Sequence, residues 1–371
     1  MEEVKITVIG AGVIGLSIAS ELSNAYDDVF VLDKNETFGQ ETSSRNSEVI
    51  HSGIYYEQNS LKALLCVEGA GLLYELCKKN SINYKKVGKL VLATEQSEIK
   101  KIEKLFGKGR NNNVNGLQIL SGKELSRFEY EINAVAALYS PNTGIIDSHL
   151  LMKYFYNQAK NNGVLFSFDS EVTSLDRRGD SFIVGIKKEN YAFKTQIVIN
   201  CAGLFSDRVA ELAGINIDAA GYRLKFCKGT YFSYQNPSPV SMLIYPVPHE
   251  ELVGLGVHAT LDIGGRLRFG PDTEYIETID YRIDANKQDL FYRSASKIIN
   301  GLDKNAFMPD MAGIRPKLQG PGEKVRDFVI ADETDKGLAG LINLIGIESP
   351  GLTASIAIAK KVVTMVKTIV D

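Results

Sequence analysis

The chain of 371 residues has no tryptophan and only four cysteines, and charge of neither sign dominates it. Lys and Arg number 42 against 45 Asp and Glu, so no overall field favours nucleic acid or an anionic membrane. The cysteines form no C-x-x-C pair, and no histidine stands at zinc-ligand spacing from them. We therefore predict reduced thiols and no metal site. The four cysteines are Cys66, Cys77, Cys201 and Cys227.

The sequence also lacks an apolar run of the ~20 residues that would span a bilayer. Its first residues, Met1-Glu2-Glu3, carry neither the basic nor the apolar region of a signal peptide. We therefore expect a cytoplasmic protein whose contact with a membrane is at most peripheral, on the inner face. At ~100–200 residues per domain, the length suggests two domains.

A glycine-rich turn stands between a short β-branched run and a small apolar segment. The run Lys5–Ile9 predicts a strand buried on both faces, and residues 16–22 predict a helix. Between them, Gly10 permits a tight turn, Gly12 lets the backbone approach a pyrophosphate, and Gly15 lets helix and strand pack closely. The helix N-terminus offers unpaired N–H groups to phosphates. The alternative is a glycine turn without a ligand.

An acidic residue, Asp33, ends the second predicted strand, Val29–Leu32. A carboxylate at this place accepts hydrogen bonds from an adenosine ribose and repels a 2′-phosphate, which disfavours NADP. The βαβ opening and this acidic residue together indicate a dinucleotide site. They do not by themselves distinguish FAD from NAD.

Two later segments favour FAD. A strand over residues 196–200 runs into Cys201-Ala202-Gly203, whose small residues can pass close to a cofactor. The segment Gly346–Thr353 puts a further helix N-terminus at the end of a strand. Its positive end suits the N1 and C2=O region of a flavin, where the reduced ring carries negative charge. We therefore predict FAD, bound non-covalently.

A polar, irregular stretch, Thr42–Tyr56, combines one arginine, one histidine and two tyrosines with many hydroxyl groups. We expect its first half to wrap the flavin and its second half to present His51 to a substrate. The alternative is a hydroxyl-rich loop that caps the next predicted helix, Leu61–Asn80.

Residues 46–56 resemble the signature of the L-2-hydroxyglutarate dehydrogenase/oxidase family, which belongs to the D-amino-acid-oxidase superfamily of FAD enzymes. The chain departs from that pattern at Glu48, where the family has glycine, and at Pro316-Lys317. The resemblance implies oxidation of a small L-2-hydroxy acid, with L-2-hydroxyglutarate giving 2-oxoglutarate, by hydride transfer to flavin N5. The likeness continues at Ser60–Ala63, Gly88–Leu90, Thr143–Asp147, Cys201–Arg208, Ile244–Pro248, Leu255–His258 and Ala312–Arg315.

Such a reaction needs a base and fixed positive donors. Of the four histidines, we favour His51 as the base and His258 as a residue that orients the substrate, with the reverse left open. His149 and His249 are expected at the surface. Arg315 is the best bidentate clamp for a carboxylate. Further candidates for substrate binding are Tyr56, Lys228, Tyr245 and Lys317, with solvated lysines and a core tyrosine as alternatives.

The expected fold is α/β, α+β in part, with a Rossmann-like FAD-binding domain and a second, antiparallel-sheet substrate domain. The first takes residues 1–80, 145–215 and 308–371, the second residues 81–144 and 216–307, and the active site lies between them. Residues 274–300 are expected to be mainly helical. The predicted FAD contacts are Gly10, Gly12, Val13, Ile14, Gly15, Asp33, Lys34, Thr42, Ser43, Arg45, Asn46, Ser47, Val172, Cys201, Ala202, Gly203, Gly313, Arg315, Pro350, Gly351, Leu352 and Thr353.

Three functions remain open from the sequence. The first is FAD-dependent oxidation of an L-2-hydroxy acid. The second keeps the flavin and oxidises glycerol-3-phosphate or a small amine or amino acid, since one scaffold serves many substrates. The third is FAD binding without catalysis. The electron acceptor, oxygen or a quinone, is left open, as is the oligomeric state.

Overall fold

The computed structural model describes residues 2–129, 131–188, 191–248 and 256–370. It confirms the predicted N-terminal βαβ unit of β1 (Glu3–Ile9), α1 (Val13–Leu22) and β2 (Val29–Leu32). β1 lies between two parallel neighbours, and its last four residues are buried, as expected for a strand covered on both faces.

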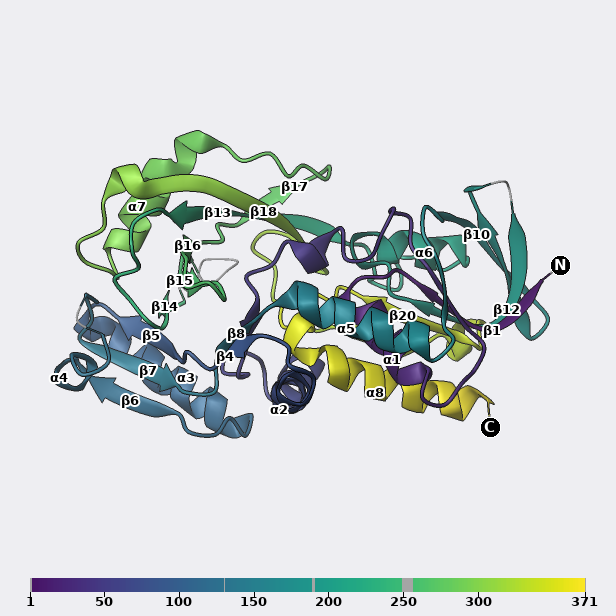
Figure 1. Ribbon diagram of the computed structural model, residues 1–371, viewed down its shortest axis with the longest axis horizontal. Helices are drawn as coiled ribbons and strands as arrows, with labels where there is room; N and C mark the ends of the chain where they lie inside the picture. Colours follow the sequence, from purple (N-terminus) through teal and green to yellow (C-terminus); the bar gives the residue numbers. More distant parts are fainter. Residues whose placement is uncertain (1, 130, 189–190, 249–255, 371) are drawn as a thin grey trace.

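An eight-stranded sheet fills the half of the molecule that holds both termini (Figure 1). Its parallel centre runs β12-β1-β2-β9, and β20 pairs in parallel with the other edge of β12. Antiparallel β10 and β11 extend the sheet beyond β12, and β19 pairs antiparallel with β20. The added strands are β9 (Leu165–Ser167), β10 (Val172–Arg178), β11 (Ser181–Ile186), β12 (Ala192–Asn200), β19 (Val329–Asp332) and β20 (Leu341–Ile345).

Four helices pack together against this sheet and bury the larger of its two core clusters (Figure 1). The predicted helix Leu61–Asn80 is confirmed as α2, which Ser60 caps by accepting a hydrogen bond from the Ala63 N–H. α8 packs on both α1 and α2, and α1 packs on α5. The other helices of this half are α5 (Ser148–Asn161), α6 (Ser206–Leu212) and α8 (Gly351–Val370).

A nine-stranded sheet forms the other half of the molecule (Figure 1). Its order is β17-β13-β16-β15-β14-β5-β7-β6, and β18 pairs antiparallel with β13 along nearly the whole length of both. The strands are β5 (Lys89–Ala93), β6 (Gln118–Ser121), β7 (Ala136–Ser140), β13 (Lys225–Tyr234), β14 (Leu243–Pro246), β15 (Ala259–Leu261), β16 (Leu267–Phe269), β17 (Glu274–Ile276) and β18 (Phe307–Lys317).

The division into two domains stays a prediction. The predicted boundary at residue 308 would assign β18 to the FAD-binding domain, although β18 pairs with β13 in the nine-stranded sheet. A small three-stranded sheet, β3-β8-β4, connects the two halves. Its strands are β3 (Val49–Ile50), β4 (Tyr84–Lys85) and β8 (Gly144–Ile146).

Two local predictions were wrong. Residues 274–300 are mainly extended or irregular, with the single α-helix α7 (Gln288–Ser296), because this polar segment lies along the nine-stranded sheet and begins with β17. The Asn-rich segment Arg110–Gly116 is predicted from the sequence to be a loop, but its first two residues are helical, since α3 (Ile99–Asn111) ends at Asn111. The sequence also predicts a turn at Glu189-Asn190, which lies outside the described residues.

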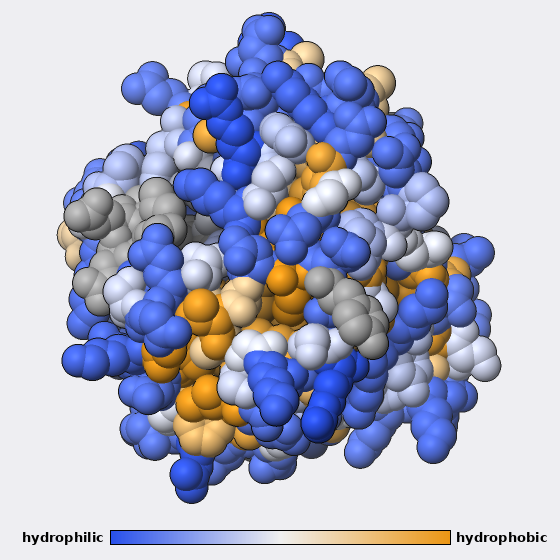
Figure 2. Space-filling view, turned by 90° about the vertical axis from the view of Figure 1, so that its left-hand side faces the viewer, coloured by the Kyte–Doolittle hydropathy of each residue, from blue (hydrophilic) through white to orange (hydrophobic). Residues whose placement is uncertain are grey.

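The end face beyond the nine-stranded sheet carries a band of apolar side chains between polar ones (Figure 2). Large hydrophobic residues of this half that are exposed include Ile119 on β6 and Leu290 on α7. No helix within the described ranges has the length and the apolar character that crossing a membrane requires.

Candidate active site

The glycine turn is shaped by contacts that only glycine permits. Gly10 has a φ of +107°, and a Cβ there would lie 2.4 Å from the carbonyl oxygen of Cys201. A Cβ on Gly15 would lie 1.9 Å from the carbonyl oxygen of Gly10, so this glycine sets the close packing of α1 on β1. Gly12 is the N-cap of α1. The turn thus leaves the start of α1 open toward the cavity described below.

Asp33 ties the end of β2 to this turn. Its Oδ2 accepts a hydrogen bond of 2.7 Å from the Ala11 N–H, and its Oδ1 accepts from Asn35. Burial raises the pKa of Asp33, while the hydrogen bonds from Asn35 and Ala11 oppose the rise. The carboxylate lies at the cavity wall, where we expected it to meet a ribose.

The polar stretch after β2 bridges the two sheets. Ser43 accepts a hydrogen bond from the Val13 N–H at 2.9 Å, and Thr42 donates to the carbonyl oxygen of Ile314 on β18. The Arg45 guanidinium lies over the ring of Tyr281, 4.2 Å from its centroid. The segment therefore connects α1 with β18 in the wall of the cavity described below, and its wrapping of a flavin stays a prediction.

Glu48 stands where the family pattern has glycine, and its backbone conformation explains why a residue other than glycine is unfavourable there. Its φ is +56°, the left-handed region that favours glycine. The side chain offsets this cost by accepting hydrogen bonds from the Ser148 N–H and Oγ at 3.0 and 2.8 Å. Glu48 thereby anchors the loop to the start of α5.

All these segments surround one cavity of about 640 Å³ that reaches from the glycine turn to the nine-stranded sheet. Predicted FAD residues that line it are Gly10, Gly12, Val13, Ile14, Asp33, Lys34, Thr42, Ser43, Arg45, Asn46, Ser47, Val172, Cys201, Ala202, Gly203, Gly313, Arg315, Pro350, Gly351 and Leu352. Gly15 and Thr353 lie behind the wall, where Gly15 sets helix packing and Thr353 accepts a hydrogen bond from the His51 N–H.

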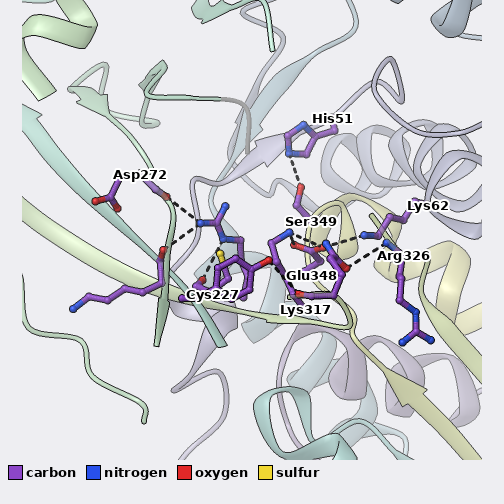
Figure 3. A network of polar contacts seen from close by, with 12 residues as sticks. His51, Lys62, Cys227, Asp272, Lys317, Arg326, Glu348 and Ser349 are labelled. Carbon is purple, nitrogen blue, oxygen red and sulfur yellow. Dashed lines mark hydrogen bonds and ion pairs between the residues drawn. The ribbon is translucent and has the colours of Figure 1, made fainter. Parts of the chain in front are cut away.

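His51 lies in the cavity wall, at the point where the two halves of the molecule meet. Its Nε2 is 3.1 Å from the Oγ of Ser349, the residue two positions before α8 (Figure 3). Burial lowers the pKa of His51 well below 6.5, and the charges of Lys89 and His258 act in the same direction. The imidazole is therefore neutral at pH 7, which is the form that can accept a proton.

His258 lies in the same wall and is buried. Its Nδ1 is 2.9 Å from the carbonyl oxygen of Gly256, so Nδ1 carries the proton and Nε2 keeps its lone pair. The ring stacks on Tyr245 with 3.7 Å between centroids. Burial, followed by the charge of Lys89, lowers the pKa of His258 to about 3. The cavity thus presents two neutral imidazoles.

Arg315, on β18, is fixed by three backbone carbonyl groups. Its Nε donates to Cys227, and its Nη2 donates to Lys228 and to Asp272, at 3.3, 3.3 and 3.0 Å. These acceptors orient the guanidinium without neutralising its charge. Arg315 is therefore a pre-oriented cation in the cavity wall that can bind an anionic group.

A buried charge cluster lies beside Ser349. Glu348 accepts hydrogen bonds from the Nζ atoms of Lys62 and Lys317, the shortest being 2.8 Å from Lys317 (Figure 3). All three side chains are at most 7% exposed. Burial alone would raise the pKa of Glu348, but Lys317 and Lys62 lower it to about 2. The cluster holds the strand-to-helix turn that carries Ser349.

Three predicted substrate residues do not line the cavity. Lys317 faces Glu348, and Lys228 donates to the carbonyl oxygen of Arg282. Tyr56 lies behind Ser349, whose side chain hydrogen-bonds to it. Tyr245, by contrast, does line the cavity. His149 is exposed, and His249 lies outside the described residues.

Sequence reasoning missed several residues of the wall. Tyr231 carries no motif that distinguishes it from a core aromatic residue. Phe205 and Ser349 stood inside the segments Cys201–Arg208 and Gly346–Thr353, which were the available signal. Lys89, behind the wall, belongs to the likeness at Gly88–Leu90, but the sequence did not indicate that it is 1% exposed and acts on both histidines.

The residues present fit a flavin dinucleotide. The glycine cradle leaves room for a pyrophosphate at the start of α1, and the Nε of Arg45 in the wall is buried without a protein acceptor. A Cβ on Gly313 would lie 2.1 Å from the carbonyl oxygen of Arg45, so β18 and the loop that carries Arg45 approach each other closely. In the part of the chain that the structure describes, no cluster of His, Cys, Asp and Glu could hold a metal ion.

Known proteins are similar to this chain in sequence or in fold. An L-2-hydroxyglutarate dehydrogenase from Arabidopsis thaliana, named as mitochondrial, is 38% identical over 97% of this chain and 83% of its own length. A glycerol 3-phosphate dehydrogenase from Caloramator mitchellensis is 31% identical over 98% of this chain and 74% of its own. An L-alpha-glycerophosphate oxidase from Mycoplasma pneumoniae, solved with FAD bound, superposes with a TM-score of 0.88 at 26% identity, covering 99% and 95% of the two chains.

The model of the DAO family, described as FAD dependent oxidoreductase, matches residues 5–365. This match covers the glycine turn, both histidines, Arg315 and the start of α8. The prediction of an FAD enzyme is confirmed, and binding without catalysis is set aside. The chain belongs to the DAO family of FAD-dependent oxidoreductases, with FAD as its cofactor.

Proposed function

We propose that this flavoenzyme oxidises L-2-hydroxyglutarate, or a close L-2-hydroxy acid, to the corresponding 2-oxo acid. The observation that carries the proposal is the meeting, in one cavity wall, of an un-neutralised guanidinium, Arg315, with two neutral imidazoles, His51 and His258. A 2-hydroxy acid needs these two functions on adjacent carbons: a cation for the carboxylate and a base for the hydroxyl group. The 38% identity with a protein named L-2-hydroxyglutarate dehydrogenase supports the choice of substrate.

Arg315 binds the carboxylate next to the carbinol carbon in this proposal. Backbone carbonyls hold its Nε and Nη2, which fixes the plane of the guanidinium and leaves Nη1 for the substrate. A carboxylate held by a fixed donor has little freedom, so the hydroxyl group at C2 is oriented as well.

His51 accepts the hydroxyl proton, and His258 orients the substrate. Both rings are neutral, so the lone pair that a base needs is present at pH 7. Ser349 holds the Nε2 side of His51, whereas the Nδ1 of His258 is held by Gly256 and its Nε2 is left as an acceptor. The reverse assignment therefore remains the alternative. Bound FAD supplies the hydride acceptor, at flavin N5.

Glycerol-3-phosphate is the second candidate substrate. The Mycoplasma pneumoniae and Caloramator mitchellensis proteins, which share almost the whole length of this chain, are named for this compound. The same guanidinium could bind a phosphate, and the same histidine could accept the proton of the C2 hydroxyl group. Both compounds carry about two negative charges at neutral pH, so the preference for the hydroxy acid rests on the identity of 38% with the protein named for it, against 31% with the Caloramator mitchellensis protein.

The test is anaerobic bleaching of the yellow holoenzyme. L-2-hydroxyglutarate should reduce the flavin, while D-2-hydroxyglutarate, glycerol-3-phosphate and glycine should reduce it far more slowly. Arg315→Lys should keep the flavin, and the ratio of its flavin reduction rate constant to the substrate dissociation constant should fall by on the order of 100-fold, because the charged contact from a pre-oriented guanidinium is lost. His149→Ala, at an exposed site, is the matched control. Faster reduction by glycerol-3-phosphate would replace the proposed substrate.

The reoxidising partner is tested with the same preparation. Admitting oxygen or a soluble quinone to the reduced enzyme measures which of the two restores the yellow colour faster. A cytoplasmic location, with peripheral membrane contact at most, likewise stays a prediction.

A further inference from the structure

A buried lysine lies behind the wall of the cavity that carries the histidines. Lys89, the first residue of β5, is 1% exposed and is among the largest fully buried side chains. Its Nζ lies 3.9 Å from the ring centroid of Tyr245 and 5.4 Å from that of Tyr55. Within the described ranges, its ammonium group faces aromatic rings rather than a carboxylate.

Tyr245 connects this lysine to the cavity. One face of its ring receives Lys89 at 3.9 Å, and His258 stacks at 3.7 Å with an angle of 18° between the ring planes. Two groups this close to one centroid cannot share a face without overlapping, so they lie on opposite faces. Lys89, Tyr245 and His258 therefore form a layered stack that ends at the cavity. A cation over a tyrosine face is held there by the ring quadrupole.

Lys89 acts on both histidines. After burial, its charge is the next cause that lowers the pKa of His51 and of His258. Burial also lowers the pKa of Lys89 itself, to about 7. The remaining titratable groups that act on these three are Cys66, whose thiol donates to the His51 carbonyl group, and Arg315, which acts on His258. Lys89, His51 and His258 are thus three bases in one buried region, and protonation of one disfavours protonation of the others.

We propose that Lys89 is a positioning residue: the positive charge that it carries behind Tyr245 keeps the two cavity histidines in the neutral form down to a lower pH than burial alone would. A neutral imidazole with a free lone pair then still faces the substrate under mildly acidic conditions. As the pH falls through 7, the first proton goes to Lys89 and opposes protonation of His51 and His258. The inference rests on the proposed function only in giving one of these histidines the role of base.

The chain's four histidines allow a direct test by NMR. Holoenzyme labelled with carbon-13 at the histidine ring gives four resonances, and His149→Gln and His249→Gln variants identify two of them, which leaves those of His51 and His258. In the wild type, these two resonances should titrate at least one pH unit below 6.5, the ordinary value for histidine. In Lys89→Met the pKa values of His51 and His258 should rise by about one unit, because a positive charge two stacking distances from His258 is removed. In Lys89→Arg the positive charge is kept, so both pKa values should stay as low as in the wild type.

Three outcomes would overturn the proposal: unchanged pKa values of the cavity histidines in Lys89→Met, a rise in Lys89→Arg as large as in Lys89→Met, or wild-type cavity histidines that titrate near 6.5, the ordinary value. The last of these needs no variant, so a Lys89→Met protein that fails to fold leaves the idea testable. The acidic limb of the pH profile for flavin reduction should move with the NMR titration. Because the NMR is recorded without substrate, failure of the proposed substrate leaves this result untouched.

Discussion

Glutamine in place of Glu348 should destabilise the protein strongly and in a pH-dependent way. Glu348 is buried between Lys62 and Lys317, and these lysines lower its pKa from 4.5 to about 2. A fall of that size corresponds to about 3 kcal/mol of stability at neutral pH. Because the folded-state pKa is depressed, this stability is complete above pH 4.5 and is lost as the pH falls toward 2. Considered from the lysines, the same loss leaves two buried ammonium groups without a carboxylate, and breaking such a buried pair costs about 3–5 kcal/mol in total.

Thermal unfolding of the holoenzyme with excess FAD measures the effect. For a chain of this length, such a loss lowers the midpoint by on the order of 4–6 °C at pH 7. The difference in unfolding midpoint between the wild type and Glu348→Gln should become smaller as the pH falls from 4.5 to 3. Glu57→Gln is the matched control, since Glu57 pairs with Lys108 but is 76% exposed, and its loss should be small at any pH. A Glu348→Gln midpoint equal to that of the control, or a gap independent of pH, would refute the reasoning.

Three further predictions concern the cofactor and the base. Gly15→Ala should purify colourless, because the new Cβ would lie 1.9 Å from the Gly10 carbonyl oxygen. The ratio of flavin to protein absorbance measures this, and Gly71→Ala on α2, where a Cβ meets no atom within 4 Å, is the control. His51→Ala should keep FAD but lose its reduction by substrate in stopped-flow, and normal reduction would transfer the role of base to His258. Acid denaturation should release all the yellow colour into solution, whereas colour in the pellet would indicate a covalent flavin.

The sequence predicted those parts of the site that depend on short-range signals. The turn from Gly10 to Gly15 and the acidic Asp33 belong to one βαβ unit, so their spacing alone describes their geometry. The helix Leu61–Asn80 was predicted with the same bounds that the structure gives it. Arg315 and His51 were found by their chemistry together with the family resemblance, and the cavity contains both.

The sequence could not predict partners that meet only through tertiary contacts. Lys317 resembled a substrate cation, but its partner Glu348 is 31 residues away and buried with it. The sequence does not show that Lys89 is buried, because Tyr245, on which it packs, and His258, which stacks on Tyr245, lie far along the chain. The segment 274–300 is polar and helix-compatible, and its pairing with β13 overrides that local preference.

The position of α8 has a consequence for how the enzyme is made. This helix packs on α1 and α2, Ser17 donates a hydrogen bond to the Ser355 carbonyl group, and residues 350–352 close the cavity that Gly10 and Gly12 open. A ribosome delivers the glycine turn first and α8 hundreds of residues later. The nascent chain therefore carries only part of a flavin site during most of its synthesis. The complete cavity for FAD can therefore form only after α8 has been synthesised.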